Sequence, residues 1–321
     1  MTFMPFISRT GFRILGVSRS HRLRALPSSH ENAMKPALPL FALSLTLATT
    51  SLAAAPLKTE VFTAAPEGFR VTSTLITGEQ DAVLVDSQFT LAEAHRLVAK
   101  ILESKKTLKT VLITHGHPDH YFGLEVVRAA FPQARIVAAP AVIAEIKALA
   151  PKQLAQWKPL FGANLTSEPV TPSPLTADHL ALEGQRLELI SLNPGESEAA
   201  TAVWIPSTRT LIAGDTAYQQ VHAYLVNADA RWRAQWLKNI EQLDKRGATT
   251  VIPGHRAENA ALGPTALRDT ATYIRDFEAS LAAATDVDGV KRPVLAKYGA
   301  FELPIILDFS AQAALATKAK R

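Results

Sequence analysis

The chain has 321 residues, a formal net charge of +5 and no cysteine. The lack of cysteine excludes disulfides, a cysteine nucleophile, thiolate metal sites and lipidation of a cysteine. Residues 1–55 hold six basic residues and one acidic residue, a net of +5, so the other 266 residues sum to zero. The excess of positive charge therefore lies in residues 1–55. The rest of the chain gives no reason to expect a nucleic-acid partner or binding to anionic lipid.

The pattern over 34–55 is typical of a secretory signal peptide. Lys35 follows Met34, an apolar run fills 36–49, and small residues fill 51–55. The apolar run is too short for a permanent membrane span. We therefore expect no stable membrane association after cleavage.

Cleavage after Ala53 or Ala55 would leave a single folded domain over 56–321. Residues 1–33 carry five arginines and no clear helix or strand pattern, and we interpret them as an unstructured leader or a misassigned start before Met34. The protein is therefore predicted to be periplasmic or secreted.

Hydrophobic periodicity predicts alternating strands and helices along the domain. The expected strands are 59–63, 69–77, 82–86, 110–114, 135–138, 180–182, 187–192, 202–206, 210–213 and 249–252. The expected helices are one capped by Thr90, one from Asp119, 140–149, 152–161, 230–243, 264–284 and shorter ones after Asp286. The segment 162–176 contains three prolines and is expected to be a loop. Strands that alternate with helices, with a hairpin opening each half, indicate an α/β fold of two sheets packed between helix layers.

The densest group of metal-binding side chains directly follows the strand at 110–114. Within six residues the chain places His115, His117, Asp119 and His120 where a strand ends and a helix begins. Side chains separated by one residue can face a common point from an irregular turn, whereas adjacent side chains diverge. One metal ion rarely needs four such ligands, but a pair of ions that shares a nucleophile does. The pattern therefore predicts a two-metal centre.

The run His-x-His-x-Asp-His after a short strand resembles the signature of the metallo-β-lactamase superfamily of binuclear zinc hydrolases. The resemblance covers most of 56–321 and implies a four-layer αββα sandwich with two Zn²⁺ ions per chain. It implies that His115 and His117 bind one metal, and that Asp119 and His120 bind the other.

Two later motifs extend the resemblance. Asp215 closes Ala-Gly-Asp at a strand end, and His255 closes Ile-Pro-Gly-His at another. The family pattern implies that Asp215 bridges both metals and that His255 binds the second. Each motif is common alone, and their order behind the first motif is what makes them specific.

The chain departs from the family at the ligand that completes the first metal. Many relatives carry a histidine on the loop after the strand at 187–192, where this chain has Glu196. A carboxylate oxygen also binds zinc, so Glu196 is a candidate ligand. It would make the site more oxygen-rich and more tolerant of iron or manganese. The alternative is that Glu196 only caps a loop and that the first metal is weakly held or absent.

Two side chains after Asp215 are candidates for contact with substrate. Tyr218 lies three residues after Asp215, an arrangement that resembles the acyl-homoserine lactonases of the superfamily. That resemblance implies that its hydroxyl polarises the substrate carbonyl. His222 can contact substrate or replace the missing ligand, and packing is the alternative for both side chains. His95 and His179 lie outside every motif and are interpreted as structural.

Together these features predict a metal-dependent hydrolase of a small molecule. Two cations lower the pKa of a shared water, and the metal-bound hydroxide attacks a carbonyl carbon. Asp119 is predicted to orient the nucleophile and to carry its proton toward the leaving group. The expected substrate is an ester, a lactone or a cyclic amide, with a lactone or an ester favoured.

Two alternatives remain open. A metallo-β-lactamase acting on β-lactam antibiotics would also meet its substrate outside the cytoplasm. The class with a cysteine ligand is excluded, however, and Glu196 fits the other binuclear β-lactamases poorly. A periplasmic metal-binding protein without catalysis is the alternative of another class, and it would have lost its first metal site.

Overall fold

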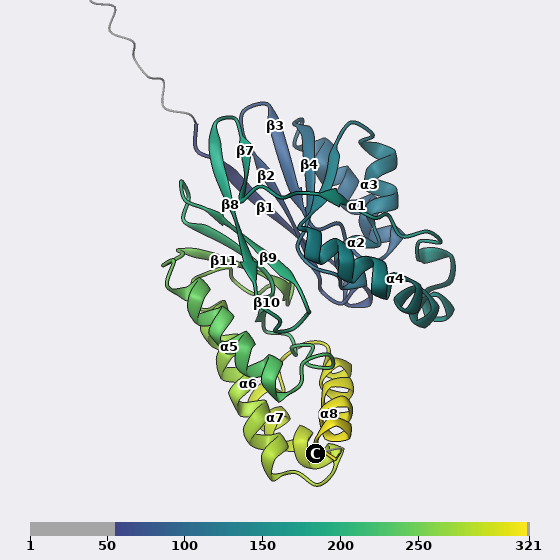
Figure 1. Cartoon of the computed structure of the whole chain (residues 1–321), viewed down its shortest axis with the longest axis vertical. Helices are drawn as coiled ribbons and strands as arrows, with labels where there is room; N and C mark the ends of the chain where they lie inside the picture. Colours follow the sequence, from purple (N-terminus) through teal and green to yellow (C-terminus); the bar gives the residue numbers. More distant parts are fainter. Residues whose placement is uncertain (1–54, 320–321) are drawn as a thin grey trace, which may run out of the picture. The chain divides into compact units, whose positions relative to one another are not determined.

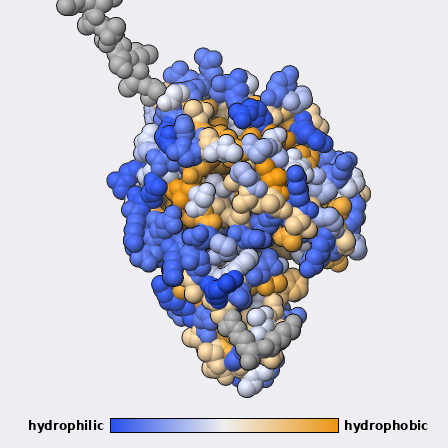
Figure 2. Space-filling view, viewed as in Figure 1, coloured by the Kyte–Doolittle hydropathy of each residue, from blue (hydrophilic) through white to orange (hydrophobic). Residues whose placement is uncertain are grey.

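The computed structural model describes residues 55–319, which form two β-sheets covered by helices (Figure 1). Residues 1–54, with the predicted leader and nearly all of the predicted signal peptide, lie outside the described residues, so export stays a prediction. Among residues 55–319, no helix combines the length and the hydropathy that a membrane span needs. Figure 2 shows hydrophilic residues along the edges of the face in view and hydrophobic residues gathered toward its middle.

The first sheet comes from the first half of the domain. Its strands, in spatial order, are β1 (Lys58–Thr63), β2 (Thr72–Thr77), β3 (Asp81–Val85), β4 (Thr107–Ile113), β5 (Arg135–Ala138) and β6 (Ser173–Pro174). Its helices are α1 (Leu91–Glu103), α2 (Pro118–Tyr121), α3 (Leu124–Ala130) and α4 (Pro140–Phe161). The strands β3 to β6 run parallel, so each connection between them must cross over, and these helices make the crossings.

The second sheet comes from the second half. Its strands, in spatial order, are β11 (Thr250–Arg256), β10 (Thr210–Gln219), β9 (Ala200–Ile205), β8 (Gln185–Leu192) and β7 (His179–Leu182). Its helices are α5 (Ala230–Asp244), α6 (Ala266–Ala283), α7 (Val287–Tyr298) and α8 (Pro304–Lys318). Only β10 and β11 pair in parallel in this sheet, and α5 connects them.

Three groups of buried apolar side chains separate the layers. One group lies between the two sheets and includes Val83 and Val203. A second packs the first sheet against its helices and includes Leu84, and a third packs the second sheet against α5 to α8 and includes Phe277. Because alternate strand residues point to opposite faces, Val83 packs between the two sheets and Leu84 packs against the helices of the first sheet. The protein is therefore a four-layer αββα sandwich, which confirms the predicted fold class.

The start of β2 differs from the prediction. The strand expected from residue 69 begins at Thr72, after a 3₁₀ turn at Pro66–Gly68. Phe69 and Arg70 have positive φ angles of 58° and 56°, which an extended strand does not allow. The unusual backbone points the Phe69 carbonyl at His255, whose Nδ1 lies 2.6 Å from the oxygen.

The two helices expected at 140–149 and 152–161 form the single helix α4, with Pro151 inside it. A proline removes one donor and disfavours a continued helix. Tertiary contacts on both sides of the proline oppose this tendency. Ile146 is buried before it, and after it Gln153 donates to the Gly116 carbonyl oxygen over 2.8 Å.

Candidate metal centre

The ends of several strands bring the predicted metal-binding side chains together. His115 follows β4 and forms an isolated bridge with Ala200 at the start of β9. His255 in β11 forms a similar bridge with Val71, just before β2. Both bridges join the first sheet to the second. The two sheets are thus held together by backbone contacts at the residues that would bind metal.

The short helix α2 presents three of the candidate ligands. His117 is its N-cap residue, Pro118 occupies the first turn, and Asp119 and His120 lie within the turn. Proline suits the first helical position because its missing N–H has no partner there in any case. The tight turn lets neighbouring residues of one motif face different parts of the centre.

An irregular stretch of β10 presents Asp215. Gly214 pairs with Pro253 and Tyr218 pairs with His255, so the segment of β10 between these pairs is longer than the segment of β11 beside it. Gly214 has a positive φ of 54°, which glycine adopts at little cost. The excess residues bulge from the ladder, and Asp215 lies in this bulge.

The candidate ligands form two groups that could each hold a metal ion. Within each group one donor atom from every residue lies within 4.8 Å of all the others. The first group is His115, His117, Glu196 and Asp215, and the second is Asp119, His120 and His255. All seven residues predicted from the sequence to bind metal are therefore brought together, including Glu196.

Asp215 lies between the two groups and offers one oxygen to each. Its Oδ2 is 3.6 Å from His115 Nε2 and 3.4 Å from His117 Nδ1. Its Oδ1 is 3.0 Å from His120 Nε2 and 3.4 Å from His255 Nε2. This geometry is what a carboxylate needs in order to bridge two metal ions.

Buried polar atoms without a hydrogen-bond partner show whether these residues suit a bound metal ion. Among the described residues, four donor atoms of the two groups are buried and have no hydrogen-bond partner. These atoms are His115 Nε2, His120 Nε2, Glu196 Oε2 and Asp215 Oδ1. A buried polar atom without a partner costs about 1–3 kcal/mol. His115 Nε2 and Glu196 Oε2 belong to the first group, and His120 Nε2 and Asp215 Oδ1 face the second, so a cation in each group would satisfy them.

Neighbouring side chains orient the imidazole rings. Asp86 accepts hydrogen bonds from the Thr114 backbone N–H over 2.9 Å and from its hydroxyl over 2.8 Å. The same carboxylate lies 2.8 Å from His120 Nδ1, which leaves Nε2 facing the centre. His117 is turned the other way, with Nε2 3.2 Å from the Asn227 amide and Nδ1 facing the centre. Contacts of this kind hold metal-binding imidazoles in one orientation.

The carboxylates make the centre strongly attractive to positive charge. Burial alone would lower the pKa of His117, but its hydrogen bond to Asp215 and the charge of Glu196 raise the pKa to about 9. Burial is likewise outweighed at His255, where Asp215 and Asp119 raise the pKa to about 10. Burial raises the pKa of Glu196. The centre therefore favours bound protons or metal cations, either of which would neutralise the negative charge of its carboxylates.

Glu145 positions the loop that carries Glu196, a role that the sequence did not reveal. This buried α4 residue accepts hydrogen bonds from the backbone N–H groups of Glu198 at 3.1 Å and Ala199 at 3.4 Å. Its side chain passes beside Gly116, where an added Cβ would lie 2.9 Å from Glu145 Cγ. Ser197 donates to Glu196 Oε1 over 2.7 Å and leaves Oε2 for the centre.

Tyr218 lies at the centre, whereas His222 lies beside it. The Tyr218 hydroxyl donates to Asp215 Oδ2 over 2.8 Å, and its ring stacks on His255 with centroids 5.2 Å apart. His222 is outside both metal-binding groups, and its Nδ1 is 2.9 Å from the Tyr273 hydroxyl. Burial lowers the pKa of His222 to about 4. His222 is therefore a neutral imidazole beside the centre, outside both metal-binding groups.

His95 and His179 lie outside both metal-binding groups. His95 is exposed on α1, and His179 Nδ1 is 2.7 Å from the exposed Asp178.

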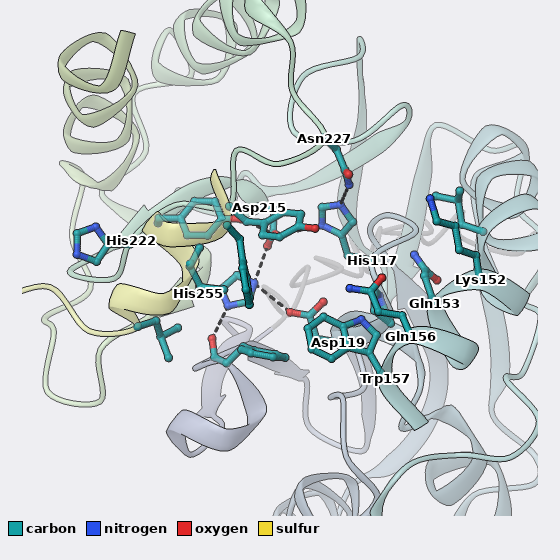
Figure 3. A pocket seen from close by; sticks show the side chains of 18 residues that line it. His117, Asp119, Lys152, Gln153, Gln156, Trp157, Asp215, His222, Asn227 and His255 are labelled. Carbon is teal, nitrogen blue, oxygen red and sulfur yellow. Dashed lines mark hydrogen bonds and ion pairs between the residues drawn. The ribbon is translucent and has the colours of Figure 1, made fainter. Parts of the chain in front are cut away.

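A cleft opens directly above the two groups (Figure 3). His117, Asp119, Asp215 and His255 form its floor. In Figure 3, Gln156 and Trp157 lie on the side of the cleft near Asp119, and His222 lies across the floor from them. A substrate bound in the cleft would therefore reach the candidate metal ligands from above.

A model of the metallo-β-lactamase superfamily matches residues 66–255, which contain all seven candidate ligands. The chain therefore belongs to the metallo-β-lactamase superfamily. This membership, with the histidine and carboxylate groups described above, makes it a metal-dependent hydrolase.

Solved structures of low sequence identity share the fold. A metallo-β-lactamase family protein from Thermus thermophilus has a TM-score of 0.59 and 18% identity, covering 83% of this chain and 93% of its own. A metallo-β-lactamase from Pontibacter korlensis has a TM-score of 0.53 and 20% identity, covering 70% and 96%. A β-lactamase domain protein from Burkholderia ambifaria has a TM-score of 0.56 and 14% identity, covering 83% and 87%. No match was found among curated protein sequences.

The contact between Gly254 and Asp215 gives a test of the centre. A Cβ at Gly254 would lie 2.0 Å from Asp215 Oδ1 and 2.7 Å from the backbone atoms Asp215 N and Gly214 C, so Gly254→Ala must displace the carboxylate together with the bulge of β10. We expect this variant to fold but to bind less metal, as measured by elemental analysis after dialysis. Gly263→Ala is the matched control, because a Cβ there meets no atom within 4 Å. Equal metal content in the two variants would contradict the arrangement.

Proposed function

We propose that the protein binds two divalent cations and uses them to hydrolyse an ester or a lactone. His115, His117 and Glu196 would hold one cation, and Asp119, His120 and His255 the other. The observation that carries the proposal is the position of Asp215, whose two oxygens each face one group. Zinc suits this mixture of nitrogen and oxygen donors, and Glu196 makes iron or manganese acceptable as well.

A pair of bound cations lowers the pKa of water and so supplies a hydroxide nucleophile near neutral pH. The residues of the chain hold and direct the reactants. Asp119 lines the cleft, and its Oδ2 lies 3.2 Å from His255 Nε2. A carboxylate here can accept a proton from the nucleophile and pass it to the leaving group.

Tyr218 is the proposed donor to the substrate carbonyl. It lines the cleft, and its single O–H proton, which is donated to Asp215 Oδ2 in this structure, would turn to the substrate carbonyl when that carboxylate oxygen faces a cation. A tyrosine hydroxyl is protonated at neutral pH and can stabilise an oxyanion that develops beside it. His222 lines the same cleft with a buried Nε2 that has no hydrogen-bond partner, which supports a contact with substrate.

The first experiment compares an acyl-homoserine lactone with a β-lactam as substrates of the zinc-loaded protein. We expect the lactone to be opened, and we expect a chelator to abolish the reaction. Lactone opening that persists without metal would contradict the proposed chemistry. Turnover of the β-lactam alone would instead make the protein a β-lactamase with Glu196 as a tolerated ligand.

The role of Asp119 is tested by Asp119→Asn. The amide keeps the shape but cannot accept the proton and binds a cation less well than the carboxylate, so we expect turnover to fall by about 10²–10⁴-fold. Thermal unfolding should show that the fold is retained. Asp178→Asn, at an exposed position outside the cleft, should keep the wild-type rate. A rate near that of the wild type in Asp119→Asn would exclude this role.

The role of Glu196 is tested by Glu196→Gln. A neutral amide binds cations less well than a carboxylate, so metal content should fall from about two ions per chain toward one. Glu198→Gln is the matched control on the same loop, because the Glu198 side chain is exposed and outside both groups. Two tightly bound ions in Glu196→Gln would mean that Glu196 is not a ligand.

A further inference from the structure

The cleft above the candidate metal ligands is bounded by one helix from each half of the domain, α4 and α8. From α4 it is lined by Leu149, Lys152, Gln153, Gln156 and Trp157, and from the α8 side by Leu303, Ile306 and Phe309. Ile306 and Phe309 are three residues apart and lie on one face of α8, and Leu303 precedes the helix as its N-cap residue. This face meets the cleft and supplies no candidate metal ligand.

The helix α8 is held beside the centre by Glu302, which lies just before it, and by Ser310 within it. The Glu302 carbonyl oxygen accepts from the His222 N–H over 3.1 Å, and the Glu302 N–H donates to the Gln220 carbonyl oxygen over 3.0 Å. Arg70 Nε donates to the Glu302 carboxylate over 2.6 Å. Further along, Ser310 Oγ accepts from the Leu225 N–H over 3.0 Å. The start of α8 is therefore tied to the segment that follows β10, so its apolar face is a fixed wall.

The opposite wall is equally constrained. The Trp157 ring packs against Phe69 with centroids 5.3 Å apart, against Phe89 at 5.8 Å and against Phe161 at 6.1 Å. These three aromatic rings hold Trp157 in place at the side of the cleft. The α8 side of the cleft is therefore apolar, whereas the α4 side combines Leu149 and Trp157 with the polar side chains of Lys152, Gln153 and Gln156.

Phe309 is the residue that the fold itself does not explain. Its side chain remains 38% exposed and belongs to none of the three buried apolar groups. Single exposed apolar side chains are ordinary, but Phe309 also lines the cleft, so a ligand bound there would cover its ring. The position also lies beyond residues 66–255, the stretch that matches the superfamily.

We propose that the substrate carries an apolar acyl chain, which lies along Ile306 and Phe309 of α8 and against Trp157 of α4. The carbonyl carbon to be attacked would then lie over the metal ligands at the cleft floor. The proposal rests on the hydrolase function proposed above and names the part of the substrate that this chain selects.

Hydrolysis of p-nitrophenyl acetate, butyrate and octanoate by the zinc-loaded protein tests the proposal. We expect kcat/KM to rise by about 10-fold or more from acetate to octanoate, because each buried methylene adds to transition-state binding. In Phe309→Ser the octanoate-to-acetate ratio of kcat/KM should fall several-fold. Ile305→Ser is the matched control, since Ile305 is 46% exposed on the same helix but does not line the cleft. It should keep the wild-type ratio.

A binding measurement separates this proposal from the proposed hydrolysis. Isothermal titration of the metal-loaded protein should show tighter binding of octanoate than of acetate, and Phe309→Ser should reduce the difference. If no ester is cleaved but octanoate still binds more tightly than acetate, the proposed hydrolysis is refuted and the acyl-chain site is supported. If esters are cleaved without regard to chain length and both carboxylates bind equally, the hydrolase stands and the acyl-chain site is refuted.

Discussion

The arrangement of the candidate metal ligands depends on one shared carboxylate. Asp215 faces one group of donors with Oδ2 and the other with Oδ1, so a displacement of this side chain would disturb both groups at once. Its position requires the bulge of β10 at Gly214 and the absence of a side chain at Gly254. The irregular strand is therefore part of the site rather than a defect of the sheet.

The remaining ligands are held by hydrogen bonds from outside the centre. Asp86 orients His120, the Phe69 carbonyl orients His255, and Glu145 fixes the loop of Glu196. These supports come from well-separated parts of the chain, and the bridges at His115 and His255 join the sheets at the same place. The two sheets are thus joined by backbone bridges at the residues whose side chains must be positioned to bind metal.

The sequence predicted the parts of this site that depend on local order. The ligands from His115 to His120 lie on one strand end and one turn, so their spacing alone indicated a metal centre. Asp215 and His255 needed the resemblance to a known family as well, because short Gly-Asp and Gly-His motifs are common. The alternation of strands and helices indicated two sheets between helix layers, and the family resemblance implied the four-layer αββα sandwich.

Features that depend on distant contacts were not predicted. Glu145 lies far along the chain from the loop that it fixes, and an isolated glutamate in a helix gives no sign of such a role. The continuous α4 required contacts strong enough to overcome Pro151, and the late start of β2 depends on positive φ angles at Phe69 and Arg70. Each of these features reflects tertiary structure prevailing over local preference.

The candidate metal ligands and the cleft-lining residues of α8 lie in different parts of the chain. All seven candidate ligands lie before residue 256, whereas α8 begins at Pro304, packs into the core through Leu307 and lines the cleft with Ile306 and Phe309. Substitutions along the exposed face of this helix can therefore accumulate without moving a ligand. A lineage with this architecture is free to change the molecules that it accepts while its reaction stays the same.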